Sequence, residues 1–441
     1  MDDTTIIGLV AAVLIGGITL PFLLRMKRTE AATEQAAAAA AEVGLDEPAT
    51  LHPVIDPDRC IATGSCIDVC PEGDVLGLRN GQAVPIAPAC CVGHGLCERA
   101  CPVDAIQLVF GTSKRGVDLP RIKQNFESNV PGLFIVGELA GMGLIRNAFE
   151  QGKQVIESIR KEGPRGRKVT GETDLVIVGC GPAGLATSLY ALEHGLGIKT
   201  VEREDIGGTV RHFPRKKMVM TRPLAVPGFG KLTGPEIEKE RLIDIWGEIV
   251  HSAGLRVNTR EGAERIVPRD NGFDIVTSKG TYRAQRVVLA IGRRGTPRKL
   301  GVPGEDLPKV SYNLLEAEAY QNDLILVVGG GDSAIEACLQ LCRQPGNKVT
   351  LSYRGDKFGR IKAANRQRIE RAIEAGQVEM LWKTNVVEIT PTEVRYRDDA
   401  NGGVERTIRN SQVFIFAGGE LPTAFLQECG VAIDTKFGAP R

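Results

Sequence analysis

The stretch that decides the fold is Leu175-Val-Ile-Val-Gly-Cys-Gly-Pro-Ala-Gly184. An apolar, strand-like run leads into Gly-x-Gly-x-x-Gly, a helix-like segment follows over residues 185–192, and the next strand-like run ends in Glu202. The glycines permit a tight turn against a pyrophosphate, the helix N-terminus faces the phosphates, and an acid about 20 residues further on binds ribose hydroxyls. The sequence therefore predicts a Rossmann-like dinucleotide-binding unit.

A second glycine motif interrupts this first unit, at Leu324-Ile-Leu-Val-Val-Gly-Gly-Gly-Asp-Ser-Ala334. The strand after its helix, residues 348–353, ends in Arg354 instead of an acid. Without that acid a free 2′-hydroxyl has no partner, whereas a nearby arginine accommodates a 2′-phosphate. The pattern favours NADP(H), with NAD(H) as the alternative. The expected contacts are Gly329, Gly331, Asp332, Ser333, Ala334, Arg354, Lys357 and Arg360.

Two cysteine runs, residues 60–71 and 91–102, repeat one pattern upstream of both motifs. A bacterial ferredoxin run reads C-x2-C-x2-C-x3-C-P and wraps an iron–sulfur cluster, and its fourth cysteine ligates the other cluster. Thr63 and His94 stand where the second cysteine of each run belongs. Because the last cysteine of each run ligates the other cluster, which we call crossed ligation, one predicted site consists of Cys60, Cys66 and Cys101. The other consists of Cys91, Cys97 and Cys70.

Three thiolates per site suit a three-iron, four-sulfur cluster with one vacant corner. A four-iron cluster completed by the His94 imidazole or by an oxygen at Thr63 is the alternative, and Cys90 is a competing ligand or a spare thiol. Zinc also takes Cys and His ligands, and a scaffold without any cluster is the remaining reading. The prolines that follow Cys70 and Cys101 favour iron–sulfur.

The amino terminus predicts a membrane anchor. Residues 5–24 carry no charge and could cross the ~30 Å hydrocarbon core as a helix. Arg25, Lys27 and Arg28 follow the run, which by the positive-inside rule puts the N-terminus outside and the rest in the cytoplasm. We therefore expect a single-pass protein of the cytoplasmic membrane, with residues 29–53 as a helical or flexible spacer.

Composition limits the remaining choices. A chain of 441 residues can form two or three domains, and a net charge of +1 gives no reason to expect nucleic acid as a partner. Gly is abundant at 52 residues and aromatic content is low at 5%, which suits glycine-rich nucleotide-binding turns. Six of the 11 cysteines lie in the paired runs, so reduced, metal-ligating thiols fit better than disulfides.

The two nested units resemble the two-dinucleotide-binding-domain flavoproteins, specifically the thioredoxin-reductase-like group. Residues 287–292, Val-Val-Leu-Ala-Ile-Gly, resemble the segment where the chain crosses between the FAD and NAD(P) domains, and residues 414–419 resemble its return. The resemblance implies that FAD binds at the first glycine motif. The expected flavin contacts are Gly179, Gly181, Pro182, Ala183, Gly184, Glu202, Arg203, Gly208, Thr209, Ala290, Gly292 and Gly418.

That group normally ends with a segment that covers the flavin, Pro-Gly-Leu-Phe-x-x-Gly-Asp followed by a helix. Here the matching segment, Pro131-Gly-Leu-Phe-Ile-Val-Gly137-Glu138, precedes the first glycine motif. The simplest account is a circular permutation, and domain termini that lie close together make such a rearrangement easy. Glu138 replaces the aspartate of the group. Gly137, Glu138, Asn147 and Ala148 are therefore expected to contact FAD.

The chain also lacks the Cys-x-x-Cys pair that many relatives carry before the second glycine motif, so it resembles the ferredoxin–NADP reductase-type members. FAD can take a hydride as two electrons and release them singly. We expect a membrane-anchored oxidoreductase that moves electrons between NADP(H), FAD and iron–sulfur clusters, to or from an unidentified protein or small-molecule carrier. A redox or oxygen sensor and a low-molecular-weight disulfide reductase are the alternatives, and a homodimer is left open. No catalytic acid or base is predicted.

The expected fold is α/β, with nested FAD and NAD(P) domains. An N-terminal transmembrane helix and an α+β ferredoxin-like domain precede them in the chain. The predicted parts are the anchor (1–28), the spacer (29–53), the ferredoxin-like domain (54–110), the permuted segment (111–168), the FAD domain (169–297), the NAD(P) domain (298–408) and the return to the FAD domain (409–441).

Overall fold

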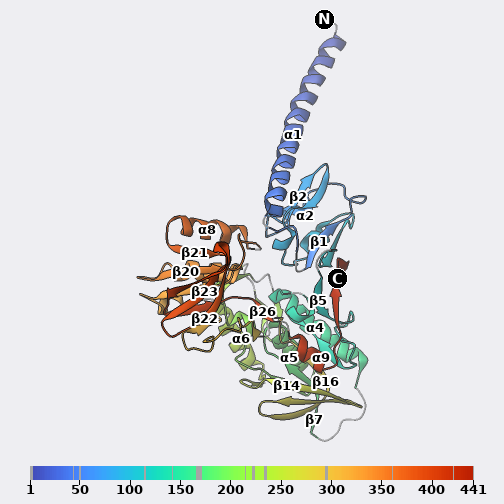
Figure 1. Ribbon diagram of the computed structural model, residues 1–441. Coiled ribbons are helices and arrows are strands. Elements are labelled where there is room, and N and C mark those ends of the chain that lie inside the picture. The colour runs from blue at the N-terminus through green and yellow to red at the C-terminus, as the bar shows by residue number, and fades with distance from the viewer. Residues whose placement is uncertain are drawn as a thin grey trace. The chain divides into compact units, whose positions relative to one another are not determined.

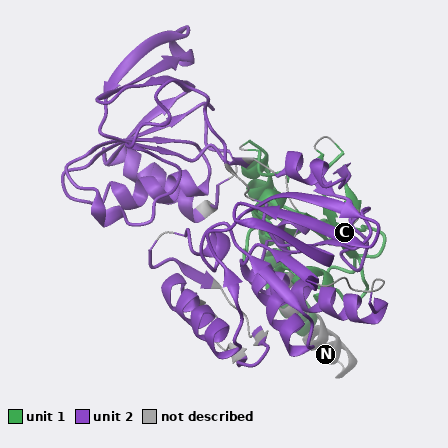
Figure 2. Ribbon diagram, turned by 90° about the horizontal axis from the view of Figure 1, so that it is seen from below, with its two compact units in different colours: residues 1–116, 437–441 green, residues 117–436 purple. Residues whose placement is uncertain are grey.

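The computed structural model divides into two compact units (Figures 1 and 2). The first comprises residues 1–116 and 437–441, and the second comprises residues 117–436. The residues described are 3–42, 44–48, 51–113, 116–141, 143–164, 171–213, 215–220, 224–232, 236–293, 296–359, 361–420 and 422–440. Both ends of the chain therefore belong to the first unit.

The first unit combines short strands and helices around the two cysteine runs. Its three-stranded sheet has the order β1-β4-β28, and β1 pairs antiparallel with β4. Asn80 and Gly81, with φ of 52° and 69°, turn the β2–β3 hairpin, as expected of an Asn-Gly turn. Its elements are α1 (Asp3–Glu42), β1 (Leu51–Ile55), α2 (Ser65–Asp68), β2 (Leu76–Arg79), β3 (Gln82–Pro85), α3 (Leu96–Ala100), β4 (Ile106–Phe110) and β28 (Ala439–Pro440).

Helix α1 corrects the prediction for the amino terminus. Among the described residues, no helix is both long and apolar enough to cross a membrane. The apolar run includes Gly16, Gly17 and Thr19, and it continues without a break into the charged half of one 40-residue helix. The predicted transmembrane anchor over residues 5–24, and with it the placement in a cytoplasmic membrane, is therefore wrong.

The second half of α1 packs against the first unit. Thr33 and Ala40 are buried, and the Glu30 carboxylate accepts a hydrogen bond from the Gly81 backbone N–H at 3.4 Å. A Cβ on Gly77 of β2 would lie 2.8 Å from the Thr33 methyl, so the glycine lets the helix approach the hairpin closely. Residues 29–42 therefore belong to the unit instead of forming a free spacer.

The second unit contains a seven-stranded sheet. Six of its strands have the order β13-β8-β7-β16-β15-β14, and the seventh, β6, pairs parallel with β16. Apolar clusters cover the sheet. Its strands have nearly continuous apolar sequences because they are buried on both faces. Its elements are β5 (Val117–Pro120), β6 (Leu133–Ile135), α4 (Ile145–Glu162), β7 (Glu172–Val178), α5 (Pro182–Glu193), β8 (Ile198–Val201), α6 (Lys239–Ser252), β13 (Val257–Asn258), β14 (Ala263–Arg269), β15 (Gly272–Thr277), β16 (Gly280–Leu289), α9 (Thr423–Glu428) and β27 (Ile433–Lys436).

Strand β6 and helix α4 come from the segment that the sequence identifies as permuted. Residues 133–135 pair with residues 287–289 of β16, on which β7 also pairs. Gly152 of α4 lies so close to α5 that a Cβ would stand 2.7 Å from the Ala186 methyl. The segment ahead of the first glycine motif thus completes the sheet that follows it, which is the arrangement that a circular permutation predicts.

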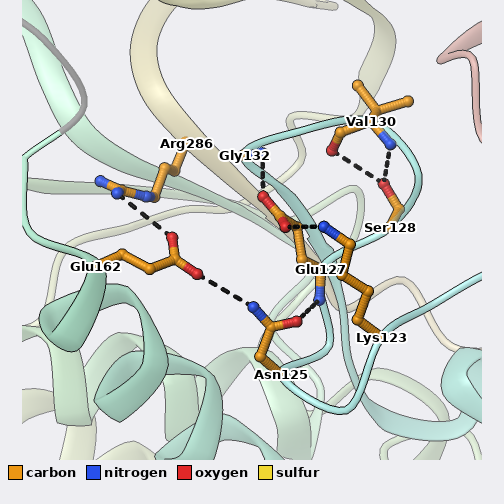
Figure 3. Close-up of polar contacts among 8 residues, drawn as sticks. All are labelled: Lys123, Asn125, Glu127, Ser128, Val130, Gly132, Glu162 and Arg286. Atoms are coloured by element: carbon orange, nitrogen blue, oxygen red, sulfur yellow. Dashed lines mark hydrogen bonds and ion pairs between the residues drawn. The ribbon is translucent and has the colours of Figure 1, made fainter.

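A polar clamp fastens this segment to β16 (Figure 3). The buried Arg286 of β16 donates to the Gly163 carbonyl at 2.7 Å and pairs with Glu162 at 3.6 Å. Glu162 accepts a hydrogen bond from Asn125 at 3.1 Å, and Asn125 in turn accepts from the Glu127 backbone N–H at 3.2 Å. The clamp therefore joins both ends of the permuted segment to one strand.

We expect Arg286→Met to lower the free energy of unfolding by about 2 kcal/mol. Removing one partner of a buried ion pair is costly, but Glu162 is 37% exposed and can regain water, which reduces the loss. Denaturant unfolding followed by flavin fluorescence measures the change. Arg283→Met on the same strand is the matched control, because the Arg283–Asp274 pair is exposed and should change stability by less than about 0.5 kcal/mol. Equal losses of unfolding free energy in Arg286→Met and Arg283→Met would contradict the stabilising role of this clamp.

A second, five-stranded parallel sheet has the order β18-β25-β19-β20-β21, and a three-stranded meander, β22-β23-β24, lies between β21 and β25 in the chain. The two crossing segments lie side by side, because β17 pairs with β26. Strand β25 belongs to this second sheet, so the sheet extends beyond the predicted boundary at residue 408. Its elements are β17 (Thr296–Pro297), β18 (Val310–Ser311), β19 (Leu324–Val328), α7 (Asp332–Leu341), β20 (Lys348–Tyr353), α8 (Ala363–Glu374), β21 (Val378–Trp382), β22 (Thr384–Ile389), β23 (Glu393–Asp398), β24 (Val404–Arg409), β25 (Gln412–Ile415) and β26 (Gly419–Glu420).

Candidate functional site

The first glycine motif forms a turn between β7 and α5. Gly179 has φ of +97°, and a Cβ there would lie 2.6 Å from the Ala290 carbonyl oxygen. Gly181 caps α5 with an ordinary φ of −74°, and Pro182 is the first helical residue. Gly208, with φ of +52°, brings its backbone up to Gly181, where a Cβ would stand 3.0 Å from the Gly181 Cα. Gly181 and Gly208 thus present backbone without side chains at the N-terminal end of α5.

Glu202 lies at the end of β8, beside this turn. It is 8% exposed, and its carboxylate accepts hydrogen bonds from the backbone N–H of Cys180 at 2.6 Å and of Glu204 at 2.9 Å. These bonds fix the carboxylate at the edge where the resemblance places a ribose. Arg203 is exposed, and its stem packs near Gly262. Ala290 donates its backbone N–H to the Val178 carbonyl, which holds the crossing strand against the motif.

The permuted turn supplies the other side of this site. Gly137, with φ of +81°, begins a short 3-10 helix that carries Glu138, and a Cβ on Gly137 would stand 2.9 Å from the Ala183 methyl. Gln151 of α4 accepts the Gly137 backbone N–H at 2.6 Å, while its own Nε2 is buried without a hydrogen-bond partner. Asn147 and Ala148 lie in the first turns of α4. Gln151 was not selected from its sequence pattern, because its role depends on a turn 14 residues away.

These residues fit FAD. Gly181 carries no side chain at the N-terminus of α5, where a pyrophosphate binds, and Glu202 suits ribose hydroxyls. The buried Nε2 of Gln151 lacks an acceptor that a flavin could supply. The predicted contacts Thr209, Gly292 and Gly418 lie on the turn after Glu202 and on the two crossing segments, and Gly292 and Gly418 have φ of +68° and +91°. The first and permuted motifs therefore meet at one site.

The second glycine motif repeats this design between β19 and α7. Gly329 has φ of +142°, and a Cβ there would lie 2.5 Å from the Phe416 carbonyl oxygen. Gly331 caps α7 with open space around it, and Ser333 is exposed in the first turn. Ala334 packs below the motif and is fully buried. Arg354 and Lys357 are exposed beyond the end of β20, whereas Arg360 lies outside the described residues.

The first cysteine triad lines an open hollow in the first unit, together with Thr63 and Ala83. Burial raises the pKa of the Cys66 thiol, and the neighbouring Cys60 and Cys101 raise it further. Two sulfurs of this triad accept hydrogen bonds from backbone N–H groups. Ala83 donates to Cys60 at 3.4 Å, and Ala105 donates to Cys101 at 3.2 Å. The three cysteines predicted to share a site thus lie together, although they are far apart in sequence.

The second triad gathers in the same way. Burial raises the pKa of Cys97 to about 12, with Cys91, Cys70 and Cys66 of the first triad as further causes. Burial raises the pKa of Cys91 to about 11, and Cys70 is again among its neighbours. Protonated thiols with neighbouring sulfurs suit a cluster that displaces the protons when it binds. The neighbours of Cys66 all belong to the crossed grouping predicted from the spacing, whereas Cys97 lies near Cys66 as well as near its own triad. The crossed grouping stays a prediction.

Thr63 and His94 occupy matching positions in the two runs. Thr63 is exposed, lines the cavity of the first triad and accepts a hydrogen bond from the Ser65 hydroxyl at 3.2 Å. His94 is half-buried, and its carbonyl accepts a bond from Arg99 at 3.2 Å. Within the described part of the chain, no three His, Cys, Asp or Glu side chains converge tightly enough to hold a single metal ion. Cluster thiolates each bind a different iron, so they stand farther apart.

Known proteins resemble both parts of the chain. Residues 52–102 match a family described as a 4Fe-4S dicluster domain. Bacilliredoxin reductase Bdr of Bacillus subtilis is 29% identical over 270 residues, which cover 60% of this chain and 82% of the relative. Ferredoxin–NADP reductase of Ignicoccus hospitalis is 29% identical over 236 residues, or 51% of this chain and 67% of the relative.

A solved structure agrees with this relationship. The bacillithiol disulfide reductase Bdr from Bacillus cereus superimposes with a TM-score of 0.54 at 28% identity, covering 61% of this chain and 85% of that one. Residues 176–440, more than half of the chain, match the family described as pyridine nucleotide-disulphide oxidoreductase. The protein therefore belongs to this family of FAD-dependent NAD(P)H oxidoreductases, and it carries a 4Fe-4S dicluster domain fused to its N-terminal side.

Proposed function

We propose that this enzyme transfers electrons from NADPH through FAD to a pair of iron–sulfur sites, and from there to a protein or small-molecule carrier. The observation that carries the proposal is the crossed gathering of the two cysteine triads in a chain that also holds two dinucleotide cradles. Bound FAD supplies the conversion of a two-electron hydride into single electrons. The glycine turns hold the phosphates, Glu202 fixes the ribose, and Gln151 orients the permuted turn against the first motif.

The two sites are proposed to hold different fourth ligands. Thr63 offers at most a hydroxyl at an open cavity, which favours a three-iron cluster or a solvent-completed corner at the first triad. His94 offers an imidazole at the second triad, which favours a complete four-iron cluster there. Paramagnetic resonance of parent and His94→Ala protein tests this assignment. A second-site signal that is unchanged by the substitution would refute imidazole ligation.

The relay is tested by anaerobic stopped-flow spectroscopy of the intact protein. NADPH should bleach the flavin absorbance first, and a slower phase should follow as cluster absorbance between the flavin bands declines. Iron and acid-labile sulfide analysis of the same sample establishes the cluster content. Flavin bleaching without any second phase, in protein that contains both clusters, would refute the relay and leave a simple flavin reductase.

Arg354 is expected to select NADPH. Its exposed guanidinium follows β20, where an NAD-binding unit would place an acid. We expect Arg354→Ala to raise the KM for NADPH about tenfold, the loss of roughly one charged hydrogen bond, while the KM for NADH stays within about twofold. Steady-state dye reduction measures both. Arg409→Ala, which removes an exposed cation at the end of β24, should change neither value.

A second candidate is a low-molecular-weight disulfide reductase that uses the bare flavin. The similarity to proteins named bacillithiol disulfide reductase favours it. The two functions separate in a single assay. Disulfide reduction that persists after loss of both clusters supports the second candidate, whereas one-electron dye reduction that disappears with the clusters supports the relay.

A further inference from the structure

The loop that carries the predicted 2′-phosphate contacts is tied to the second glycine motif by an aspartate. Asp332, the first residue of α7, accepts at one carboxylate oxygen the backbone N–H of Lys362 at 3.0 Å and the Asn365 amide at 2.7 Å. Asn365 is 6% exposed and lies in α8. The end of the loop that begins at Arg354 is thus fixed to the helix whose N-terminus faces the dinucleotide.

Asp332 is predicted from the sequence as a dinucleotide contact, but its position suits a residue that holds the loop better than one that touches the cofactor. A carboxylate repels the phosphates that bind at a helix N-terminus, although it interacts well with the helix dipole. One of its oxygens already accepts two N–H groups. Its geometry is that of a residue that positions the loop.

The rest of the loop is held in place from the other side. Arg366 donates to the carbonyls of Phe358 at 2.7 Å and Gly359 at 2.9 Å. Phe358 is buried and packs edge-on against Trp382, with ring centroids 4.7 Å apart. At the start of the loop the Gly355 carbonyl accepts the Lys383 backbone N–H at 3.0 Å, so the loop is fixed at both ends while Arg354 and Lys357 remain exposed. A binding loop that is ordered in advance loses less entropy when the ligand arrives.

A further chain of contacts orients the Asn365 amide. The amide also approaches the Glu336 carboxylate at 3.3 Å, and the other oxygen of Glu336 pairs with Lys217 at 3.0 Å. Two acceptors, Asp332 and Glu336, thus face the same nitrogen of Asn365. Because both acceptors belong to α7, the amide nitrogen of Asn365, not its oxygen, must point toward that helix.

We propose that Asp332, Asn365 and Glu336 form a clamp that positions the basic loop for the 2′-phosphate, so that the clamp sets the preference for NADPH over NADH. The proposal rests on the proposed use of NADPH and deepens it. None of the three residues contacts the 2′-phosphate in this scheme. Each acts through the backbone that presents Arg354 and Lys357.

The test compares NADPH and NADH in steady-state dye reduction by the intact, FAD-loaded protein. For Asn365→Ala we expect the KM for NADPH to rise about tenfold, with kcat and the KM for NADH each within about twofold. Glu336→Gln should also raise the KM for NADPH, but by a smaller factor. Asp332→Asn keeps an acceptor oxygen and should retain most of the preference, whereas Asp332→Ala should lose it.

The outcomes separate the clamp from the proposed function. Asn385→Ala, at an exposed asparagine bonded to Asp399, is the matched control and should leave both KM values unchanged. An equal rise for NADPH and NADH in Asn365→Ala would indicate general damage and overturn the clamp. An unchanged NADPH preference would also overturn it. Failure of NADPH to bleach the flavin of the parent protein would instead refute the proposed function.

Discussion

Cys66→Ala and Cys97→Ala are each expected to remove one of the two clusters, so that iron and acid-labile sulfide fall to about half of the parent content. Both thiols are buried and lie among the other sulfurs of their triads, and alanine leaves only two thiolates at the site. One-electron dye reduction should fall at least tenfold in the double variant. Flavin content should stay unchanged, because the first glycine motif lies in the other unit.

The crossed grouping makes this prediction sharper. Cys101→Ala should abolish the same paramagnetic signal as Cys66→Ala, and the two substitutions together should be no worse than either alone. Cys338→Ala is the control, because Cys338 is a fully buried thiol in the core of the second sheet. If instead Cys70→Ala, from the same run, reproduced the loss caused by Cys66→Ala, the sites would be sequential and the crossed grouping would be wrong.

The sequence predicted the parts of the site that depend on local chain geometry. A glycine turn between a strand and a helix needs only adjacent residues, so both dinucleotide motifs could be located from their spacing. The permuted segment was also recognisable, because Pro131–Glu138 keeps its local pattern wherever it stands in the chain. Its pairing with β16 was not predicted and is seen only in the structure.

Features that depend on distant residues were missed. Gln151 binds the turn at Gly137, and Asp332 binds Asn365 in the next helix of its sheet, yet neither contact leaves a periodic or spacing signal. The amino terminus was misjudged for a related reason. The absence of charge over residues 5–24 does not measure how apolar the run is. Further along the same helix Thr33 is buried, so that part of α1 packs against the protein.

The two glycines at the first motif are expected to fail in different ways when each is replaced by alanine. Gly179→Ala places a methyl 2.6 Å from a backbone oxygen at a φ of +97°, and neither backbone can move away without disturbing the sheet. We expect a loss of more than about 4 kcal/mol of stability, with or without FAD. Little folded protein should be recovered, as judged by circular dichroism and denaturant unfolding.

Gly181→Ala, two residues away, is the matched comparison. Its φ of −74° suits any residue, and the nearest atom to the new methyl is 3.8 Å away. The apoprotein should therefore unfold within about 0.5 kcal/mol of the parent, while the methyl occupies the space where the backbone must approach the pyrophosphate, so FAD affinity should fall about a hundredfold. Titration of apoprotein with FAD measures this loss. Equal FAD affinity in Gly181→Ala and parent would mean that the pyrophosphate binds elsewhere, because only an occupied cradle makes this glycine necessary.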